Sequence, residues 1–206
     1  MVSIGWWTRD RSNIDLVKEP HVSTSTDSRL MASSAPRTGP AHDRATSICA
    51  FVVRITLGLL WLENLSWKKP PDFGAKDGSG LYHFTKLAID YPVFPPYSAL
   101  VKSVVLPNFT VFGWAVFLLE IGLAVFLLLG LATRLWALIG IAQTVAIFLS
   151  VGASPNEWKW SYFLMAAAHL AVLGFAAGRV WGLDALVRRR MNGRSGRLAK
   201  SYLLAS

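Results

Sequence analysis

Four polar side chains stand inside four long apolar stretches of this sequence, and their types suit proton and charge chemistry. Arg54 and Glu120 carry opposite charges. Gln143 both donates and accepts hydrogen bonds, and His169 can change its protonation state near neutral pH. A carboxylate in the middle of a bilayer costs roughly 2.5 to 3.5 kcal/mol on insertion scales. Glu120 lies in the middle of the apolar run 109–131, so it needs a partner, a proton or a function.

The elements that must position these side chains are long helices. A bilayer core of about 30 Å is crossed by about 20 helical residues. At about 1.5 Å per residue, each polar side chain falls in the middle half of the bilayer, so we expect all four to face inward and meet. In this network Arg54 pairs with Glu120, while Gln143 and His169 add hydrogen bonds. The four membrane-spanning helices are predicted at residues 48–65, 109–131, 133–152 and 160–178.

Two interpretations of this polar network remain open. It can be structural, since a buried ion pair with an amide and an imidazole fixes the packing of a four-helix bundle. It can also be a site for a ligand, a quinone or a proton, because ionisable residues inside membranes commonly mark function. An error in the register of the expected helices would instead scatter the four residues.

Composition indicates an all-α integral membrane protein. Of the 206 residues, 53% are hydrophobic and 16% are charged, whereas soluble proteins average about 25% charged residues. The net charge of +9 does not indicate nucleic-acid binding, because seven of the 21 Lys and Arg lie from Arg179 onward, beyond the last apolar stretch. With Cys49 as its one cysteine, the sequence holds no cysteine redox or metal pair, and it has no nucleotide-binding glycine motif.

The ends of the chain are polar and basic. We expect residues 1–47 to be a disordered cytoplasmic tail and residues 187–206 to be a basic cytoplasmic tail. Fourteen Lys and Arg fall on the side of the two termini and six on the other side, which favours both termini in the cytoplasm. No apolar stretch follows Met1, so we expect no cleavable leader, and Met31 is an alternative start.

The segment at residues 66–108 is predicted to be a long outer loop with two short interfacial helices. Ser79 can cap the first, which runs to residue 89, and Pro96 can open the second, over residues 97–106. At the rim of the first span we favour membrane anchoring over an entrance for an anionic substrate. The rim residues are Glu63, Asn64, Trp67, Lys68 and Lys69.

Several short motifs resemble the DoxX-like family of membrane proteins. The first span contains Arg54-Ile-Thr-Leu-Gly58, and the second contains Glu120-Ile-Gly-Leu-Ala followed by the hairpin Leu129-Gly-Leu-Ala-Thr-Arg134. Trp160 and Gly182-Leu-Asp184 continue the likeness, which covers about residues 48–186. The outer loop, rich in proline and aromatic residues, is similar to the DoxD branch, the large subunit of thiosulfate:quinone oxidoreductase.

This resemblance implies a four-helix subunit in a bacterial or archaeal plasma membrane. For the DoxD branch it implies electron transfer from thiosulfate to a membrane quinone, giving tetrathionate, together with a small second subunit. The arginine, glutamate and hairpin arginine of the family correspond to Arg54, Glu120 and Arg134. The sequence has no fused domain that corresponds to the second subunit, so we expect an accessory redox role rather than a self-sufficient enzyme.

The candidate site follows from the residues and the resemblance together. We expect Glu120, Arg54 and His169 to be catalytic and Arg134 to be structural in the hairpin. Arg54, Gln143 and Trp61 are the expected contacts of a substrate or quinone; no motif for a metal or a flavin is present. The alternative is that this chain is a non-catalytic anchor for a soluble redox or sulfur-transfer protein. In that case the basic tail of this chain binds anionic lipid or an acidic partner.

Overall fold

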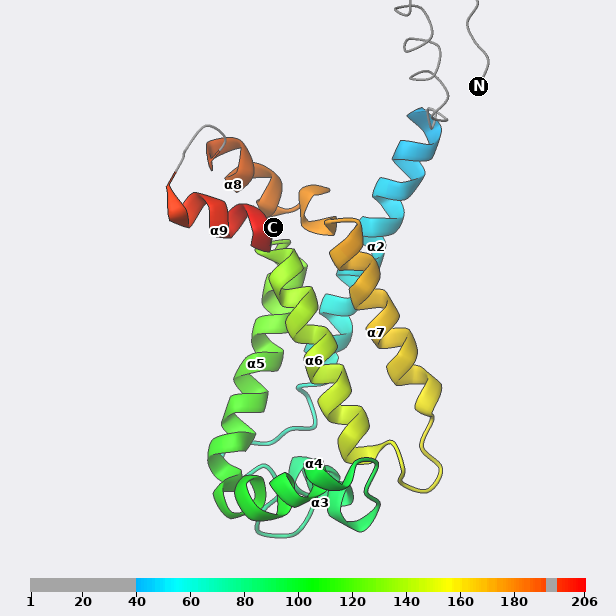
Figure 1. Ribbon diagram of the computed structural model, residues 1–206, viewed down its shortest axis with the longest axis vertical. Coiled ribbons are helices and arrows are strands. Elements are labelled where there is room, and N and C mark those ends of the chain that lie inside the picture. Colours follow the sequence, from blue (N-terminus) through cyan, green and yellow to red (C-terminus); the bar gives the residue numbers. More distant parts are fainter. Residues whose placement is uncertain (1–39, 192–195) are drawn as a thin grey trace, which may run out of the picture. The chain divides into compact units, whose positions relative to one another are not determined.

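The computed structural model describes residues 40–191 and 196–206, and every regular element in this part of the chain is helical (Figure 1). The expected N-terminal tail lies outside the described residues except for positions 40–47, which form the first turns of a helix. The α-helices are α2 (Pro40–Glu63), α3 (Gly80–Asp90), α4 (Pro95–Leu100), α5 (Phe109–Leu129), α6 (Thr133–Val151), α7 (Lys159–Gly174), α8 (Leu183–Met191) and α9 (Arg197–Ala205). Shorter helical turns are η1 (Val101–Val105), η2 (Leu106–Asn108) and η3 (Ala177–Arg179).

Among the described residues, three helical segments are long and apolar enough to cross a membrane. They are Asp43–Glu63, Pro95–Leu129 and Thr133–Val151. The second is a continuous helical run in which α4 passes through the π turn η1 and the tight turn η2 into α5. The expected fourth span corresponds to α7, which has 16 residues and is not among these three. At 1.5 Å per residue α7 is about 24 Å long, shorter than a bilayer core of about 30 Å.

The long helices α2, α5, α6 and α7 pack against one another. α2 contacts α5 and α7, and α6 also contacts α5 and α7. Because lipid tails are as apolar as these side chains, close packing rather than exclusion of water holds such helices together. Gly140 of α6 shows this closeness, since a Cβ there would lie 2.1 Å from Nε2 of His169 on α7. The buried apolar centre consists of Ala50, Leu57, Trp61, Leu123, Ala124, Leu127, Ala137, Val172 and Ala177.

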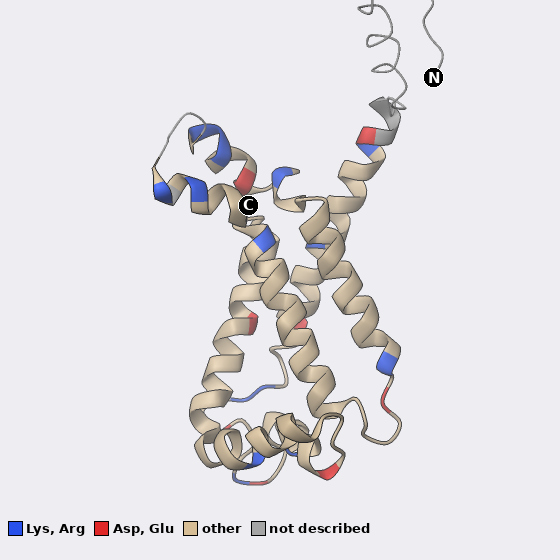
Figure 2. Ribbon diagram, in the orientation of Figure 1, with Lys and Arg blue, Asp and Glu red and all other residues tan. Residues whose placement is uncertain are grey.

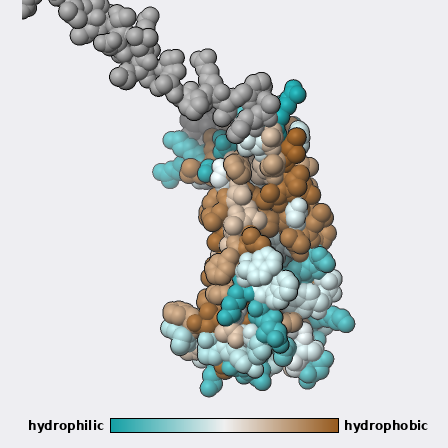
Figure 3. All heavy atoms as spheres, turned by 90° about the vertical axis from the view of Figure 1, so that its right-hand side faces the viewer, coloured by the Kyte–Doolittle hydropathy of each residue, from teal (hydrophilic) through white to brown (hydrophobic). Residues whose placement is uncertain are grey.

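The outer surface of these helices is apolar. In the face shown in Figure 3, hydrophobic residues gather over the middle and hydrophilic residues lie toward the two ends. Leu118, Leu138 and Leu170 have more than half of their surface exposed. Figure 2 shows Lys and Arg gathered on α8 and α9, while the long helices are mostly uncharged. This distribution is that of a membrane protein, with lipid covering the exposed leucines.

The hairpin between α5 and α6 is closed by a residue from the start of α8. Gly130 ends α5 in the left-handed conformation, with φ 65°. The buried Asp184 carboxylate accepts hydrogen bonds from the backbone N–H groups of Ala132 (2.7 Å) and Thr133 (3.0 Å), so it caps α6 from outside that helix. The Tyr202 hydroxyl donates to the same carboxylate at 2.5 Å. Burial and this bond raise the pKa of Tyr202, which keeps it a donor.

Substituting Gly130 with alanine tests this hairpin. A Cβ there would lie 2.7 Å from Nη1 of Arg54 and 2.8 Å from the Cα of Gly182. An L-residue in the left-handed region also costs about 1–2 kcal/mol. We expect Gly130→Ala to lower the midpoint of thermal unfolding in mild detergent by several degrees. Gly174→Ala is the matched control, because nothing lies within 4 Å of a Cβ there; equal losses in both variants would show that the hairpin geometry is unimportant.

Candidate functional site

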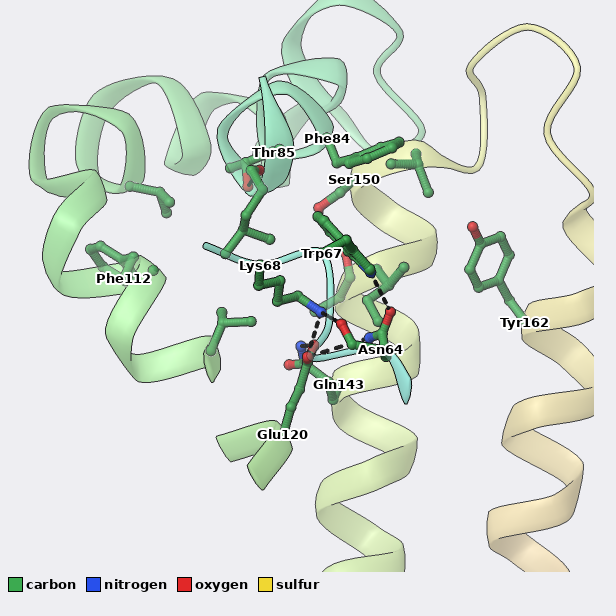
Figure 4. Close-up of a pocket in the computed structure, with 18 of the residues that line it drawn as sticks. Asn64, Trp67, Lys68, Phe84, Thr85, Phe112, Glu120, Gln143, Ser150 and Tyr162 are labelled. Atoms are coloured by element: carbon green, nitrogen blue, oxygen red, sulfur yellow. Dashed lines mark hydrogen bonds and ion pairs between the residues drawn. The ribbon is translucent and has the colours of Figure 1, made fainter. Parts of the chain in front are cut away.

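A cavity of about 1020 Å³ lies among α2, α5, α6 and α7 at the end of the molecule that carries α3 and α4. α3 covers it through Phe84 and Thr85, and Tyr162 of α7 lies across from them (Figure 4). Pockets for small molecules commonly hold about 300–1,000 Å³, so this one is large. Its apolar lining includes Leu60, Trp61, Phe109, Phe112, Val116, Ile147, Val151 and Met165.

A cluster of polar side chains forms the base of this cavity, and Glu120 is its centre. In Figure 4, Lys68, Asn64 and Gln143 converge on the Glu120 carboxylate. Lys68 Nζ forms an ion pair with Oε2. Asn64 Nδ2 donates to Oε2 at 3.3 Å, and Gln143 Nε2 donates to Oε1 at 3.2 Å. Only 1% of Glu120 and 3% of Lys68 is exposed, so the pair is shielded from solvent.

Lys68 reaches Glu120 because the chain turns inward after α2 ends at Glu63. Backbone hydrogen bonds from Asn64 to Leu60 (3.0 Å) and from Lys68 to Leu65 (3.1 Å) form that turn. Lys68 Nζ also donates to the Asn64 carbonyl at 3.0 Å, and it lies 4.3 Å from the centre of the Trp67 ring. Burial lowers the pKa of Lys68, and Glu120 acts in the opposite direction.

The expected pairing of Arg54 with Glu120 is wrong. Arg54 is fully buried, but its Nη1 donates to the carbonyls of Leu127 (2.6 Å) and Leu128 (3.0 Å), at the end of α5. Leu127 lies two turns beyond Glu120, about 10 Å along the helix axis. The last carbonyls of a helix lack partners within it and carry partial negative charge, so they attract a cation. Arg54 therefore closes the end of α5 opposite the cavity.

His169 also lies apart from the Glu120 cluster. Its Nε2 accepts a hydrogen bond from Trp61 Nε1 at 3.1 Å, because an indole N–H can only donate. Its Nδ1 then carries the proton and donates to the Met165 carbonyl at 2.8 Å. Both ring nitrogens have partners and the ring is fully buried. The geometry supports a positioning role, in which His169 holds Trp61 in the cavity wall.

The other residues predicted from the sequence lie either at the cavity or at the hairpin between α5 and α6. Gln143 contacts Glu120, as expected. Trp61 lines the cavity, and its contact with a substrate or quinone stays a prediction. Arg134 lies in the first turn of α6, at the hairpin, and its structural role stays a prediction. Lys68 and Asn64 are the residues that sequence reasoning missed, since both were assigned to membrane anchoring. One signal could have found Lys68: the expected outer loop holds an unusual number of lysines, and the positive-inside rule disfavours lysine on that side. No such signal marks Asn64.

The cavity can hold a ligand with a polar head and an apolar body. Lys68, Asn64 and Gln143 provide N–H donors at the base, and Glu120 provides an acceptor that can also take a proton. The rest of the wall is apolar and aromatic. A quinone has this division, with carbonyl oxygens on the ring and an apolar tail, so the residues present fit it.

One comparison with known families gives a match. The family model described as "TQO small subunit DoxD" matches residues 49–205, which is most of the chain. The resemblance to DoxX-like and DoxD proteins is thereby confirmed. The description names the small subunit, which corrects our expectation of the large one. No solved structure matches this chain significantly.

The ion pair makes a prediction about stability. Removing one partner of a buried pair leaves an uncompensated charge and typically costs about 3–5 kcal/mol. We expect Lys68→Met to lower the thermal unfolding midpoint in mild detergent, and Lys68→Met with Glu120→Gln to recover much of the loss. Lys69→Met, at the exposed neighbouring lysine, should have little effect. Additive losses from the two substitutions at the pair would mean that Lys68 and Glu120 do not interact.

Proposed function

Because this chain belongs to the DoxD family, we propose that its cavity is the quinone site of a thiosulfate:quinone oxidoreductase. The observation that carries the proposal is the buried Glu120–Lys68 ion pair at the base of an otherwise apolar cavity. Burying two charges needs strong compensation, and a purely structural bundle has no need of a large hollow beside them. An apolar cavity with a few convergent polar groups is the usual form of a ligand site.

The polar residues have separate parts in this proposal. When bound, the quinone accepts two electrons and two protons, and the electrons come from joining two thiosulfate ions into tetrathionate. The N–H groups of Lys68, Asn64 and Gln143 bind and orient carbonyl oxygens. Glu120 passes protons to the oxygens of the reduced ring. Each proton reaches its carboxylate from Lys68 Nζ across their contact, and Lys68 then regains a proton from the aqueous phase on the outer side between turnovers. Trp67 and the apolar walls keep water from the pair.

The arrangement in the membrane is part of the same proposal. We infer that α7 crosses the bilayer as a fourth span, since it packs against both α2 and α6. Its shorter length is made up by the turn at residues 175–176 and η3. The basic helices α8 and α9 (Figure 2) then lie in the cytoplasm with both termini, and the cavity faces the outer half of the membrane. The division into a tail at 1–47, a membrane domain at 48–186 and a tail at 187–206 follows from this topology.

A second subunit completes the enzyme in this proposal. The matching family is described as a small subunit, so the partner would be a larger chain that handles thiosulfate. The basic surface of α8 and α9 supports a second candidate function. In this alternative the chain anchors an acidic soluble redox or sulfur-transfer protein. The cations of this surface include Arg188, Arg189, Arg190, Arg197 and Lys200. In that case the Glu120 cluster would be structural.

Glu120→Gln tests the catalytic proposal. The amide preserves shape but cannot exchange protons, so we expect quinone reduction by the assembled complex to fall by about 10²-fold or more. Glu63→Gln is the matched control, because Glu63 is an exposed carboxylate at the end of α2. Assembly is checked by co-purification of the partner subunit. Normal turnover by the Glu120→Gln complex would favour the anchoring function instead.

Single cysteines test the orientation. In a Cys49→Ser background, we expect Lys76→Cys to react with a membrane-impermeant maleimide added to intact cells, and Arg190→Cys to react only after lysis. Both side chains are exposed, so neither should be protected by the fold. The reverse pattern would invert the topology, and equal labelling of both sites in intact cells would rule out the proposed number of spans.

A further inference from the structure

A second hollow adjoins the cavity on the surface of the long helices. It is a groove of about 420 Å³ between α2 and α7. Thr56 and Leu57 are on the α2 side, and Leu164 and Ala168 are on the α7 side. Apart from Thr56 and Ser161, its lining side chains are apolar. This composition differs from that of the cavity, whose base is charged.

The groove and the cavity share two lining residues. Leu60 of α2 and Met165 of α7 line both of them, so the two hollows meet at these side chains. Leu60 is 48% exposed on the surface of α2. Methionine is unbranched and flexible and adapts its shape to what it contacts. The junction is therefore made of side chains that a slender apolar group can displace.

The groove opens at the depth of the hydrocarbon core. Its α2 residues belong to the membrane-crossing segment Asp43–Glu63. Leu164 is 57% exposed and Trp160 is 56% exposed, although both are large and apolar. Exposed apolar side chains on a membrane-crossing surface face lipid tails. A molecule dissolved in the bilayer can thus reach the groove without passing through water.

We propose that the groove between α2 and α7 holds the isoprenoid tail of the quinone and is its lateral route from the bilayer. This inference rests on the proposed function, because it assumes that the ring occupies the cavity. A ring held at the Glu120 cluster must have its tail leave the cavity somewhere. The shared junction at Leu60 and Met165 leads into a hollow of matching polarity, which opens where such molecules dissolve.

The experiment compares two probes on the full-length chain in lipid nanodiscs. One is 2,3-dimethoxy-5-methyl-1,4-benzoquinone, which has no tail, and the other is the same ring with a decyl chain. Binding is measured by quenching of tryptophan fluorescence, since Trp61 and Trp67 line the cavity. Thr56→Phe narrows the groove from the α2 side and Ser161→Phe narrows it from the α7 side; both positions are exposed and line the groove but not the cavity. Leu59→Phe is the control, because Leu59 is 52% exposed on α2 and lines neither hollow.

The expected result is selective for the tail. Thr56→Phe and Ser161→Phe should each raise the Kd of the decyl probe about tenfold, which corresponds to roughly 1.4 kcal/mol. The Kd of the tailless probe should change by less than about twofold, the scatter of independent sites. Leu59→Phe should change neither value. The thermal unfolding midpoint of each variant checks its fold, and Thr56→Phe alone decides if Ser161→Phe does not fold.

The possible outcomes distinguish failure of the proposed tail groove from failure of the proposed quinone site. Failure of the wild-type chain to bind either probe would overturn the quinone site itself, and the groove with it. Binding of both probes with no effect of Thr56→Phe would overturn only the groove, leaving it as a place for an ordinary lipid chain. An equal loss for both probes would also overturn it, since a tail site cannot affect a ring that has no tail.

Discussion

The charge of Glu120, in the middle of a helix long and apolar enough to cross a membrane, is the constraint around which one half of this molecule is built. The compensating cation does not come from another long helix. It comes from Lys68, just beyond α2, so the chain must turn back into the bundle after Glu63. That turn sets Trp67 over the pair and places α3 across the top of the cavity. The hollow and its cover are thus consequences of one electrostatic requirement.

The opposite end is organised by a second, independent set of polar contacts. Arg54 occupies the free carbonyls at the end of α5, and Asp184 occupies the free N–H groups at the start of α6. Each satisfies a helix end that would otherwise be costly in an apolar setting. The two polar sets are separated by the apolar centre around Leu123 and Leu127.

Much of the helical framework was predictable from hydrophobic patterning, and its side-chain partnerships were not. The ends of α5 and α6 lie within about two residues of the sequence-based prediction, because the lengths of the apolar runs mark them locally. The contact between Glu120 and Gln143 also followed from depth alone. Depth could not reveal that the long Arg54 side chain reaches two turns away, or that a loop lysine folds inward. The partners of Arg54 and Lys68 depend on which groups are left without hydrogen bonds once the helices have packed. Only the folded structure shows this.

The cap supplied by Asp184 has a consequence for the order in which the molecule can be built. A ribosome makes α5 and α6 long before it reaches residue 184. Until then the backbone N–H groups of Ala132 and Thr133 lack the Asp184 carboxylate, and the N-cap residue of α6 provides no side-chain hydrogen bond in its place. The start of α8 consequently acts as a latch, and the amide groups of the hairpin gain their carboxylate partner only after α8 has been made and has docked.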